Sequence, residues 1–465
     1  MRNPRPAGLP SRGWWHQLTV PQFTVVTGLL VIASGTLVMA SPLCSTETVG
    51  LWEALFTVTS AITVTGLSVI DIGQELTPLG QVVLSGLILT GGLGLMAITT
   101  FLQGFVQGRS GLRHRLDKGR ALDEFGVGGI GPTFRKILTV AAALIGLGTV
   151  LLYGFGFTDI QNPGERLWAA LFHCISAYNN AGFGLWQDSL CNYRGNVVVN
   201  SVIGSLIVTG GIGWRVANDI WVNRFRLRRF ARLSLHTRLV IRSTLLLIVV
   251  GAVGLLFTEQ FATEQLLREL NWLERIQVTI FQSITTRTAG FNTVPLTVST
   301  FSDSALLLMM TLMFIGASPG SSGGGIKTTT FAALVAATRS TLRGEPDVVV
   351  RERKISDKLV LRAVAVALAS ALFVLSMAML LSLRETAVVG EDRSFSFLEN
   401  LFTCISAFGT VGLDLGVTAQ LDRWGQLVLM VGMFVGRIGI LLLLSAIYGS
   451  HPRVRIGYPV EELYI

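Results

Sequence analysis

Four stretches of this sequence share a residue pattern that could bind a cation. They read LFTVTSAITVTGL (Leu55–Leu67), LFHCISAYNNAGF (Leu171–Phe183), IFQSITTRTAGF (Ile280–Phe291) and LFTCISAFGTVGL (Leu401–Leu413). Each opens with a hydrophobic–Phe pair, carries Ser or Thr in the middle and closes on Gly followed by Leu or Phe. The spacing from that Phe to the closing Gly is 10, 10, 9 and 10 residues. This self-similarity predicts four copies of one structural unit.

The chemistry expected of these loops is the binding of a cation by backbone carbonyls. Glycine tolerates positive φ and places no Cβ in the path, and rings of carbonyls can replace the water shell of an ion. A short helix ending at such a ring would add negative partial charge. The predicted ring consists of Thr63, Thr65 and Gly66; Asn179, Ala181 and Gly182; Thr288, Ala289 and Gly290; and Thr410, Val411 and Gly412.

Acidic residues follow three of the loops, namely Asp71, Asp188 and Asp414. Carboxylates there would raise the cation concentration at the outer mouth of the ring. The competing interpretation of the glycines is that they allow close helix packing, as they often do in membranes. Four glycines in register, each after a similar amphipathic approach, favour the ring.

Membrane-spanning helices are the elements expected to position these loops. The chain has 465 residues, of which only 14% are charged, whereas soluble domains average about a quarter. Apolar runs suited to a bilayer core of about 30 Å precede the loops at Phe23–Ser41, Ile137–Phe157, Leu239–Phe257 and Leu359–Leu383. Others follow them at Leu79–Phe101, Val197–Ile220, Ala305–Thr338 and Trp424–Tyr448. The predicted fold is an all-α polytopic membrane protein with four tandem span–re-entrant pore loop–span repeats, and hence eight full transmembrane helices, around a central pore.

The distribution of charge predicts the orientation. Arginines cluster at Arg109–Arg120, Arg215–Arg242 and Arg339–Lys358, while acids collect in the alternate connections. This is the positive-inside pattern, so we expect both termini in the cytoplasm, and the net charge of +9 does not indicate nucleic-acid binding. The expected divisions are a tail at 1–22, repeat 1 at 23–108, a basic loop and repeat 2 at 109–222, a basic loop and repeat 3 with a broken second span at 223–342, repeat 4 at 343–448 and a tail at 449–465.

Two features in the later spans could obstruct a pore. The stretch GASPGSSGGGIKTTTF (Gly316–Phe331) cannot remain a regular helix, because it combines a run of small residues with a proline. It is not a phosphate-binding loop, since Ile326 separates Gly325 from the lysine. Arg437 lies near the middle of the last predicted span, where a charge is costly and usually functional. The alternatives for Arg437 are a structural ion pair or a side chain that snorkels.

The quoted loops resemble those of the Trk/Ktr/HKT superfamily of potassium transporters, and the resemblance covers nearly the whole chain. Thr410–Gly412 is close to the potassium-channel filter sequence, and the short N-terminal tail is most similar to KtrB, the membrane subunit type of the bacterial Ktr systems. The resemblance implies potassium uptake through a glycine selectivity filter. Gly66 implies potassium, because sodium-selective plant members can have Ser there. The resemblance also implies a gate beneath the filter, formed by Gly316, Gly320, Gly323, Gly324, Gly325, Lys327 and Arg437.

The resemblance implies further properties. K⁺ would be the transported ion, Na⁺ is a candidate coupling ion for symport, and no organic cofactor is expected in this chain. The protein would lie in the plasma membrane, the inner membrane of a bacterium, as a homodimer. Its expected partner is a cytosolic, nucleotide-binding regulatory ring subunit of the KtrA type.

Several alternatives remain open. The chain could be a sodium-selective or poorly selective monovalent cation transporter of the same superfamily. The basic stretch Arg215–Arg242 could serve topology and bind the anionic headgroups of membrane lipids, or it could dock the cytosolic regulator. A membrane-embedded enzyme would need paired acids, HExxH or a Ser–His pair inside the spans, and none occurs. His173 alone is expected to pack in its helix, and the four cysteines show neither zinc nor disulfide spacing.

Overall fold

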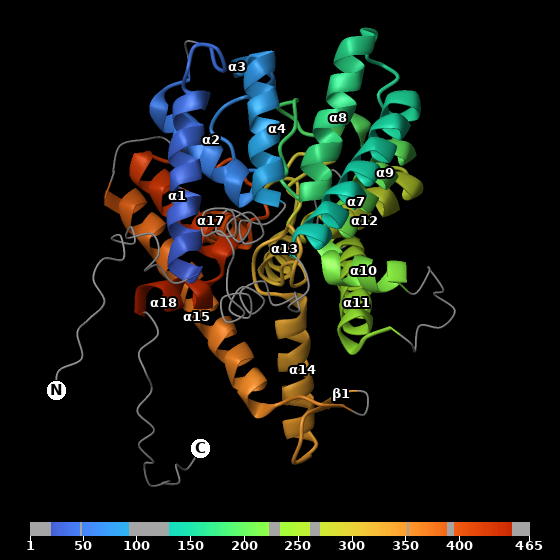
Figure 1. The fold of residues 1–465 in the computed structure, drawn as a ribbon, viewed down its shortest axis with the longest axis vertical. Coiled ribbons are helices and arrows are strands. Elements are labelled where there is room, and N and C mark those ends of the chain that lie inside the picture. Colours follow the sequence, from blue (N-terminus) through green and yellow to red (C-terminus); the bar gives the residue numbers. More distant parts are fainter. Residues whose placement is uncertain are drawn as a thin grey trace, which may run out of the picture.

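The computed structural model describes residues 20–46, 49–92, 130–222, 233–260, 270–350, 353–387 and 395–448, which are mostly helical (Figure 1). Most of the predicted tail at 1–22, the tail at 449–465 and the arginine cluster at 109–120 lie outside the described residues. So do the arginines at 224–232 within the second basic stretch.

Among the described residues, four helices are long and apolar enough to cross a membrane. They are α1 (Val20–Met39), α7 (Ile130–Leu151, continued by a π-helical turn at Leu152–Gly156), α11 (Leu235–Gln260) and α15 (Asp357–Ala387). At 1.5 Å per residue, 20 residues already span about 30 Å. Large apolar side chains on their outer faces, such as Leu37, Leu245 and Leu368, are exposed, as expected of helices that face lipid. These helices correspond to the predicted first span of each repeat.

Four shorter helices follow them and are buried mainly in their C-terminal halves. They are α2 (Leu51–Thr63), α8 (Pro163–Asn179), α12 (Trp272–Thr285) and α16 (Phe397–Gly409). Each has a glutamate in its first turn, where a negative charge complements the helix dipole. The capping box of Ser396 and Glu399 fixes the start of α16. All four helices end at one of the glycine loops.

A third set of helices leads away from the loops. It comprises α4 (Pro78–Gly92), α9 (Val197–Ile212), α13 (Asp303–Phe314) and α17 (Arg423–Ile438), followed by α10 (Trp214–Val222), α14 (Thr328–Leu342) and α18 (Ile440–Tyr448). The break predicted within Ala305–Thr338 lies at 315–327, between α13 and α14. Val197–Ile220 and Trp424–Tyr448, each predicted as one span, are each formed by two helices. Gly213 and Gly439, each with φ of +89°, interrupt these helices.

The contacts between the short and the later helices close a circle. α8 packs against α4, α12 against α9, α16 against α13, and α2 against α17. Two of these interfaces carry the same hydrogen bond: Trp168 Nε1 donates to Gln81 Oε1 at 2.7 Å, and Trp52 Nε1 donates to Gln426 Oε1 at 2.6 Å. An indole N–H usually finds a partner when buried, so Trp168 fixes α8 against α4 and Trp52 fixes α2 against α17.

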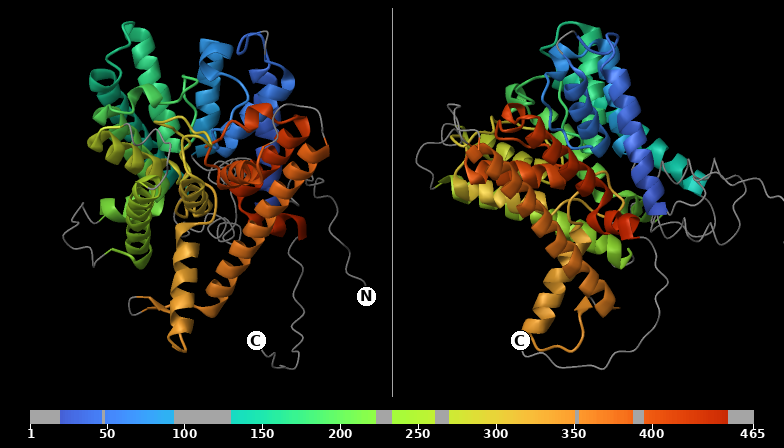
Figure 2. Two further views of the ribbon diagram at one scale, coloured as in Figure 1. Left: turned by 180° about the vertical axis from the view of Figure 1, so that it is seen from behind. Right: turned by 90° about the vertical axis from the view of Figure 1, so that its left-hand side faces the viewer.

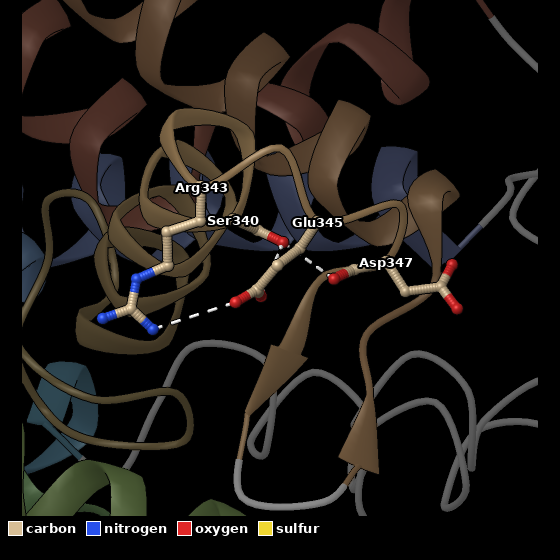
Figure 3. A network of polar contacts seen from close by, with 4 residues as sticks. All are labelled: Ser340, Arg343, Glu345 and Asp347. Carbon is tan, nitrogen blue, oxygen red and sulfur yellow. Dashed lines mark hydrogen bonds and ion pairs between the residues drawn. The ribbon is translucent and has the colours of Figure 1, made fainter.

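A small hairpin is the one departure from the all-α prediction among the described residues. α14 and α15 project from the body of the molecule (Figures 1 and 2), and β1 (Val349–Val350) pairs antiparallel with β2 (Arg353–Lys354) between them. Figure 3 shows the turn at the end of α14, where Ser340 Oγ donates to the carbonyl of Asp347 at 2.7 Å and Arg343 pairs with Glu345 at 3.8 Å. The exposed ion pair adds little stability.

Candidate functional site

Each short helix ends in a turn that reverses the chain at the centre of the molecule. After α2, α8 and α16, the residues Val64, Asn180 and Thr410 adopt the left-handed conformation. The amide of the next residue then returns to the helix: Thr65 N–H, Ala181 N–H and Val411 N–H donate to the carbonyls of Ser60, Ser176 and Ser406, each at 2.8 Å. This hydrogen bond between residues five apart in the sequence is the bond that closes a helix C-terminus of the Schellman type.

The third loop reaches the same arrangement with one residue fewer. Ala289 N–H donates to Thr285 O at 2.9 Å, and Thr288 has the positive φ, +73°. The shorter spacing, 9 instead of 10, accompanies an earlier helix end: α12 ends four residues after Phe281, whereas α2, α8 and α16 each end seven residues after their phenylalanine, so the segment between the helix end and the glycine is longer in the third loop.

The four glycines meet at the centre and form a closed ring. Gly66, Gly182, Gly290 and Gly412 all have positive φ, between +70° and +95°. A Cβ on Gly66 would lie 2.4 Å from Ala181 O, one on Gly182 2.9 Å from Ala289 O, one on Gly290 2.6 Å from Val411 O, and one on Gly412 2.1 Å from Thr65 O. Each glycine thus abuts the carbonyl that precedes the next glycine around the circle. Only glycine fits this arrangement, because any side chain would displace a neighbouring carbonyl.

Two serines support the ring through bonds that the sequence analysis missed. Ser60 Oγ accepts from Gly66 N–H at 3.0 Å, and Ser406 Oγ accepts from Gly412 N–H at 3.1 Å. The signal was present in the sequence as a serine six residues before the glycine in these two loops. Ser176 has the same spacing, but its hydroxyl makes no such bond.

The predicted register of the ring needs one correction. Thr63 and Asn179, which belong to the predicted ring with Thr288 and Thr410, are the last residues of α2 and α8. Val64 and Asn180 hold the equivalent left-handed positions. Counted from the ring glycine, Val64 and Asn180 lie two residues before it, as Thr288 and Thr410 do, whereas Thr63 and Asn179 lie three residues before it.

The three acids near the ring differ in their surroundings. Asp188 is exposed, whereas Asp71 accepts from Gly73 N–H at 2.9 Å and Gln74 N–H at 3.2 Å and so caps the short helix α3 (Ile72–Glu75). Asp414 accepts from Thr403 Oγ1 at 3.3 Å and from Thr418 N–H at 3.2 Å. Burial raises the pKa of the Asp414 carboxyl, and the bonds from Thr418 oppose that shift. Asp71 and Asp414 therefore stabilise the loops after the ring through hydrogen bonds.

The non-helical segment 315–327 lies directly against the ring. Gly324 N–H donates to Thr410 Oγ1 at 2.9 Å, and a Cβ on Gly323 would lie 2.2 Å from Thr288 Oγ1. Gly320 and Gly325 have φ of +73° and +65°, and a Cβ on Gly316 would meet Gly324 O at 2.1 Å. The glycines thus allow the segment to fold tightly on itself and to approach the ring.

Basic side chains hold this segment in place. Lys327 Nζ donates to Gly323 O at 2.7 Å, and Arg437, in the last turn of α17, donates to Ser322 O and to Gly91 O of α4. Ser318 N–H donates to Gly211 O of α9 at 3.1 Å. The segment is therefore attached at the points where α4, α9 and α17 end. Arg437 makes no ion pair with a described acid, so the structural-ion-pair alternative has no support there.

The other predicted candidates occupy structural positions. His173 is fully buried, stacks on Trp186 with centroids 4.4 Å apart, and has Nδ1 2.8 Å from Ala169 O. All four cysteines are free. Within the part of the chain that the structure describes, no group of three or more His, Cys, Asp or Glu side chains could hold a metal.

Comparison with known proteins gives a consistent result. The family TrkH, described as cation transport protein, matches residues 18–453. The chain is 35% identical to the Ktr system potassium uptake protein B of Bacillus subtilis, over 97% of each chain. It is 31% identical to the potassium/sodium uptake protein NtpJ of Enterococcus hirae, over 90% of each chain.

A solved structure has the same fold. The potassium transporter TrkH from Vibrio parahaemolyticus superimposes with a TM-score of 0.69, covering 94% of this chain and 86% of that one, at 18% sequence identity.

Proposed function

The chain belongs to the TrkH family of cation transport proteins, and we propose that it takes up potassium through the ring of Gly66, Gly182, Gly290 and Gly412. The observation that carries the proposal is the closed circle in which each glycine abuts the carbonyl before the next one. Carbonyls so arranged can replace the water shell of a monovalent cation. The C-termini of four short helices add negative partial charge at the same point.

The filter proposed here consists of backbone carbonyls at three levels. Thr65, Ala181, Ala289 and Val411 provide the level before the glycines, and the glycines themselves provide the next. Val64, Asn180, Thr288 and Thr410 provide the level nearest the segment 315–327. Thr63 and Asn179, at the helix ends, would act as supports. Asp71, Asp188 and Asp414 would attract cations to the outer mouth.

The segment 315–327 is proposed as the gate. It packs against Thr288 and Thr410 at one end of the ring, so an ion that leaves the ring there has to displace it. Lys327 and Arg437 place two positive charges on it, which repel a cation. Flux requires that the segment move and that the bonds from Arg437 and Lys327 break or rearrange.

The driving force would be the membrane potential. Entry of one positive charge gains about 2.3 kcal/mol per 100 mV, so uptake needs no hydrolytic site in this chain. We propose eight spans with both termini in the cytoplasm of the plasma membrane. Regulation by a cytosolic nucleotide-binding ring is supported by the name of the relatives, which belong to a Ktr system. Assembly as a homodimer and contact with membrane lipids are proposed from the family resemblance alone.

A second candidate function is transport of sodium as well as potassium. Sodium would then be either a cotransported ion or a competing ion. It is favoured by the similarity to a potassium/sodium uptake protein. Glycine at all four ring positions favours potassium, because carbonyls left unobstructed at all three levels suit an ion that sheds its water shell easily.

The test is growth of a potassium-uptake-deficient bacterium that expresses the chain. Rescue at low external potassium supports the proposal, and the dependence of rescue on added sodium separates coupling from competition. Absence of rescue with the protein present in the membrane, with and without sodium, would refute potassium uptake. Sodium accumulation without potassium accumulation would favour the second candidate.

A further inference from the structure

We propose that a cation at the inner end of the ring and the segment 315–327 compete for one atom, the hydroxyl oxygen of Thr410, so that potassium itself opens the gate. This inference rests on the proposed potassium uptake and adds a regulation of the same site. Its basis is the hydrogen bond in which Gly324 N–H donates to Thr410 Oγ1 at 2.9 Å.

The Gly324 amide is aimed at Thr410 by the conformation of its neighbours. Lys327 Nζ donates to Gly323 O, and Arg437 donates to Ser322 O. Two consecutive carbonyls of the segment are thus bound to cationic side chains, and the next N–H meets the ring. The segment presents a hydrogen-bond donor, with its positive partial charge, where a permeating ion would need an oxygen.

Thr410 is distinct among the four residues at this level. Val64 has no hydroxyl, and the Thr288 hydroxyl lies 3.2 Å from the side-chain amide of Asn180. Thr288 and Asn180 therefore satisfy each other whether or not the segment is present. The Thr410 hydroxyl is fully buried and is bound by the segment.

The space around this bond leaves no room for an ion beside it. A Cβ on Gly324 would lie 2.4 Å from Thr410 Oγ1, and one on Gly323 would lie 2.2 Å from Thr288 Oγ1. A cation that takes the Thr410 oxygen as a ligand must therefore displace Gly324. Since the ion then binds one state of the segment and not the other, ion binding shifts the segment toward the open state, and an open segment raises ion affinity.

Accessibility of Ser322 measures this equilibrium directly. Ser322 is 7% exposed, and its hydroxyl makes no hydrogen bond, so Ser322→Cys adds a thiol that the closed segment shields. With Cys191→Ser as background, because the other native cysteines are buried, the full chain in detergent is treated with a water-soluble thiol reagent in potassium, sodium or choline. A neutral hydrogen bond contributes about 0.5–1.5 kcal/mol, so we expect potassium to raise the modification rate about two- to tenfold over choline.

Variants of Thr410 connect the effect to its hydroxyl. Thr410→Val should be modified rapidly in choline, with no further increase in potassium, whereas Thr410→Ser should respond as the parent does. Thr57→Val removes another buried hydroxyl, one without a partner, and should leave the potassium response unchanged. Potassium uptake by the same proteins is measured in parallel.

The outcomes separate the two proposals. If the protein takes up potassium but potassium leaves the thiol modification rate unchanged or lowers it, the proposed competition is overturned and the transport proposal stands. A Thr410→Val protein that responds to potassium like the parent would also overturn it. No uptake by the parent protein would refute the transport proposal itself. The comparison of potassium with choline in the parent protein remains decisive if Thr410→Val fails to fold.

Discussion

Gly412→Ala should abolish most uptake, and its effect can be separated from that of backbone strain. Gly412 has φ of +89°, and Gly416, four residues later, has φ of +87°. Alanine at either position is held in an unfavourable conformation, which costs about 1–3 kcal/mol. A Cβ on Gly416 has nothing within 4 Å, whereas one on Gly412 would lie 2.1 Å from Thr65 O. Gly416→Ala is therefore a control matched for strain.

The size of the effect follows from these distances. Ordinary contact with a Cβ begins at 3.4 Å, so Thr65 O would have to move by about 1.3 Å to accommodate the new methyl group. A misplacement of about 1 Å can cost on the order of 10²-fold in function when geometry is fixed by the protein. We expect Gly412→Ala to lower potassium uptake at least about tenfold and to weaken discrimination against sodium. Gly416→Ala should stay within about twofold of the parent.

The assay is initial potassium uptake into potassium-depleted cells or proteoliposomes, with sodium as competitor and membrane protein quantified. Equal uptake and equal sodium competition in Gly412→Ala and Gly416→Ala would refute the argument, because the two differ only in what the Cβ meets. Equal loss in both would attribute the effect to strain and not to the ring.

Three further predictions concern the gate, the outer mouth and the helix contacts. Arg437→Ala removes the bonds to Ser322 O and Gly91 O. Because hydrogen bonds of charged groups contribute about 1.5–3 kcal/mol, cation leak into proteoliposomes should rise severalfold. An unchanged leak would contradict the assignment of the segment 315–327 as the gate. Burial raises the pKa of Asp414, so external acidification should neutralise its carboxylate at higher pH than that of an exposed aspartate, and uptake should fall as it is neutralised. In a pH profile of uptake, Asp414→Asn should lose this fall at low pH, and Asp188→Asn should keep it. Trp52→Phe leaves Gln426 Oε1 without its 2.6 Å donor, which should lower the free energy of unfolding by about 1–3 kcal/mol and so lower the unfolding temperature. Trp424→Phe, at a residue that is 47% exposed, should change the unfolding temperature little.

The local parts of the site could be predicted from the sequence. The four glycines could be identified because a loop that needs positive φ and a close carbonyl restricts the residue type shortly after a helix end. The interruption at 315–327 was also predictable, since a run of small residues with Pro319 cannot sustain a helix. Both signals depend on neighbours in the chain.

The missed features depend on contacts between distant segments or on backbone conformations that the residue type does not favour. The partners of Arg437 lie 346 and 115 residues away in the chain, and no local pattern identifies a backbone carbonyl as a partner. Val64 in a left-handed conformation could not be expected, because a β-branched residue disfavours it. The breaks at Gly213 and Gly439 did have a signal, since TGGIG and VGRIG each end in a further glycine inside the apolar run.

Location of the bound ion tests the central claim most directly. Crystals grown with rubidium as a potassium substitute would give an anomalous signal at the ion. We expect it on the axis between the carbonyls of Thr65, Ala181, Ala289 and Val411 and the four glycines. An ordered rubidium site elsewhere in the protein, with none inside the ring at saturating concentration, would contradict the assignment of the ring as the filter.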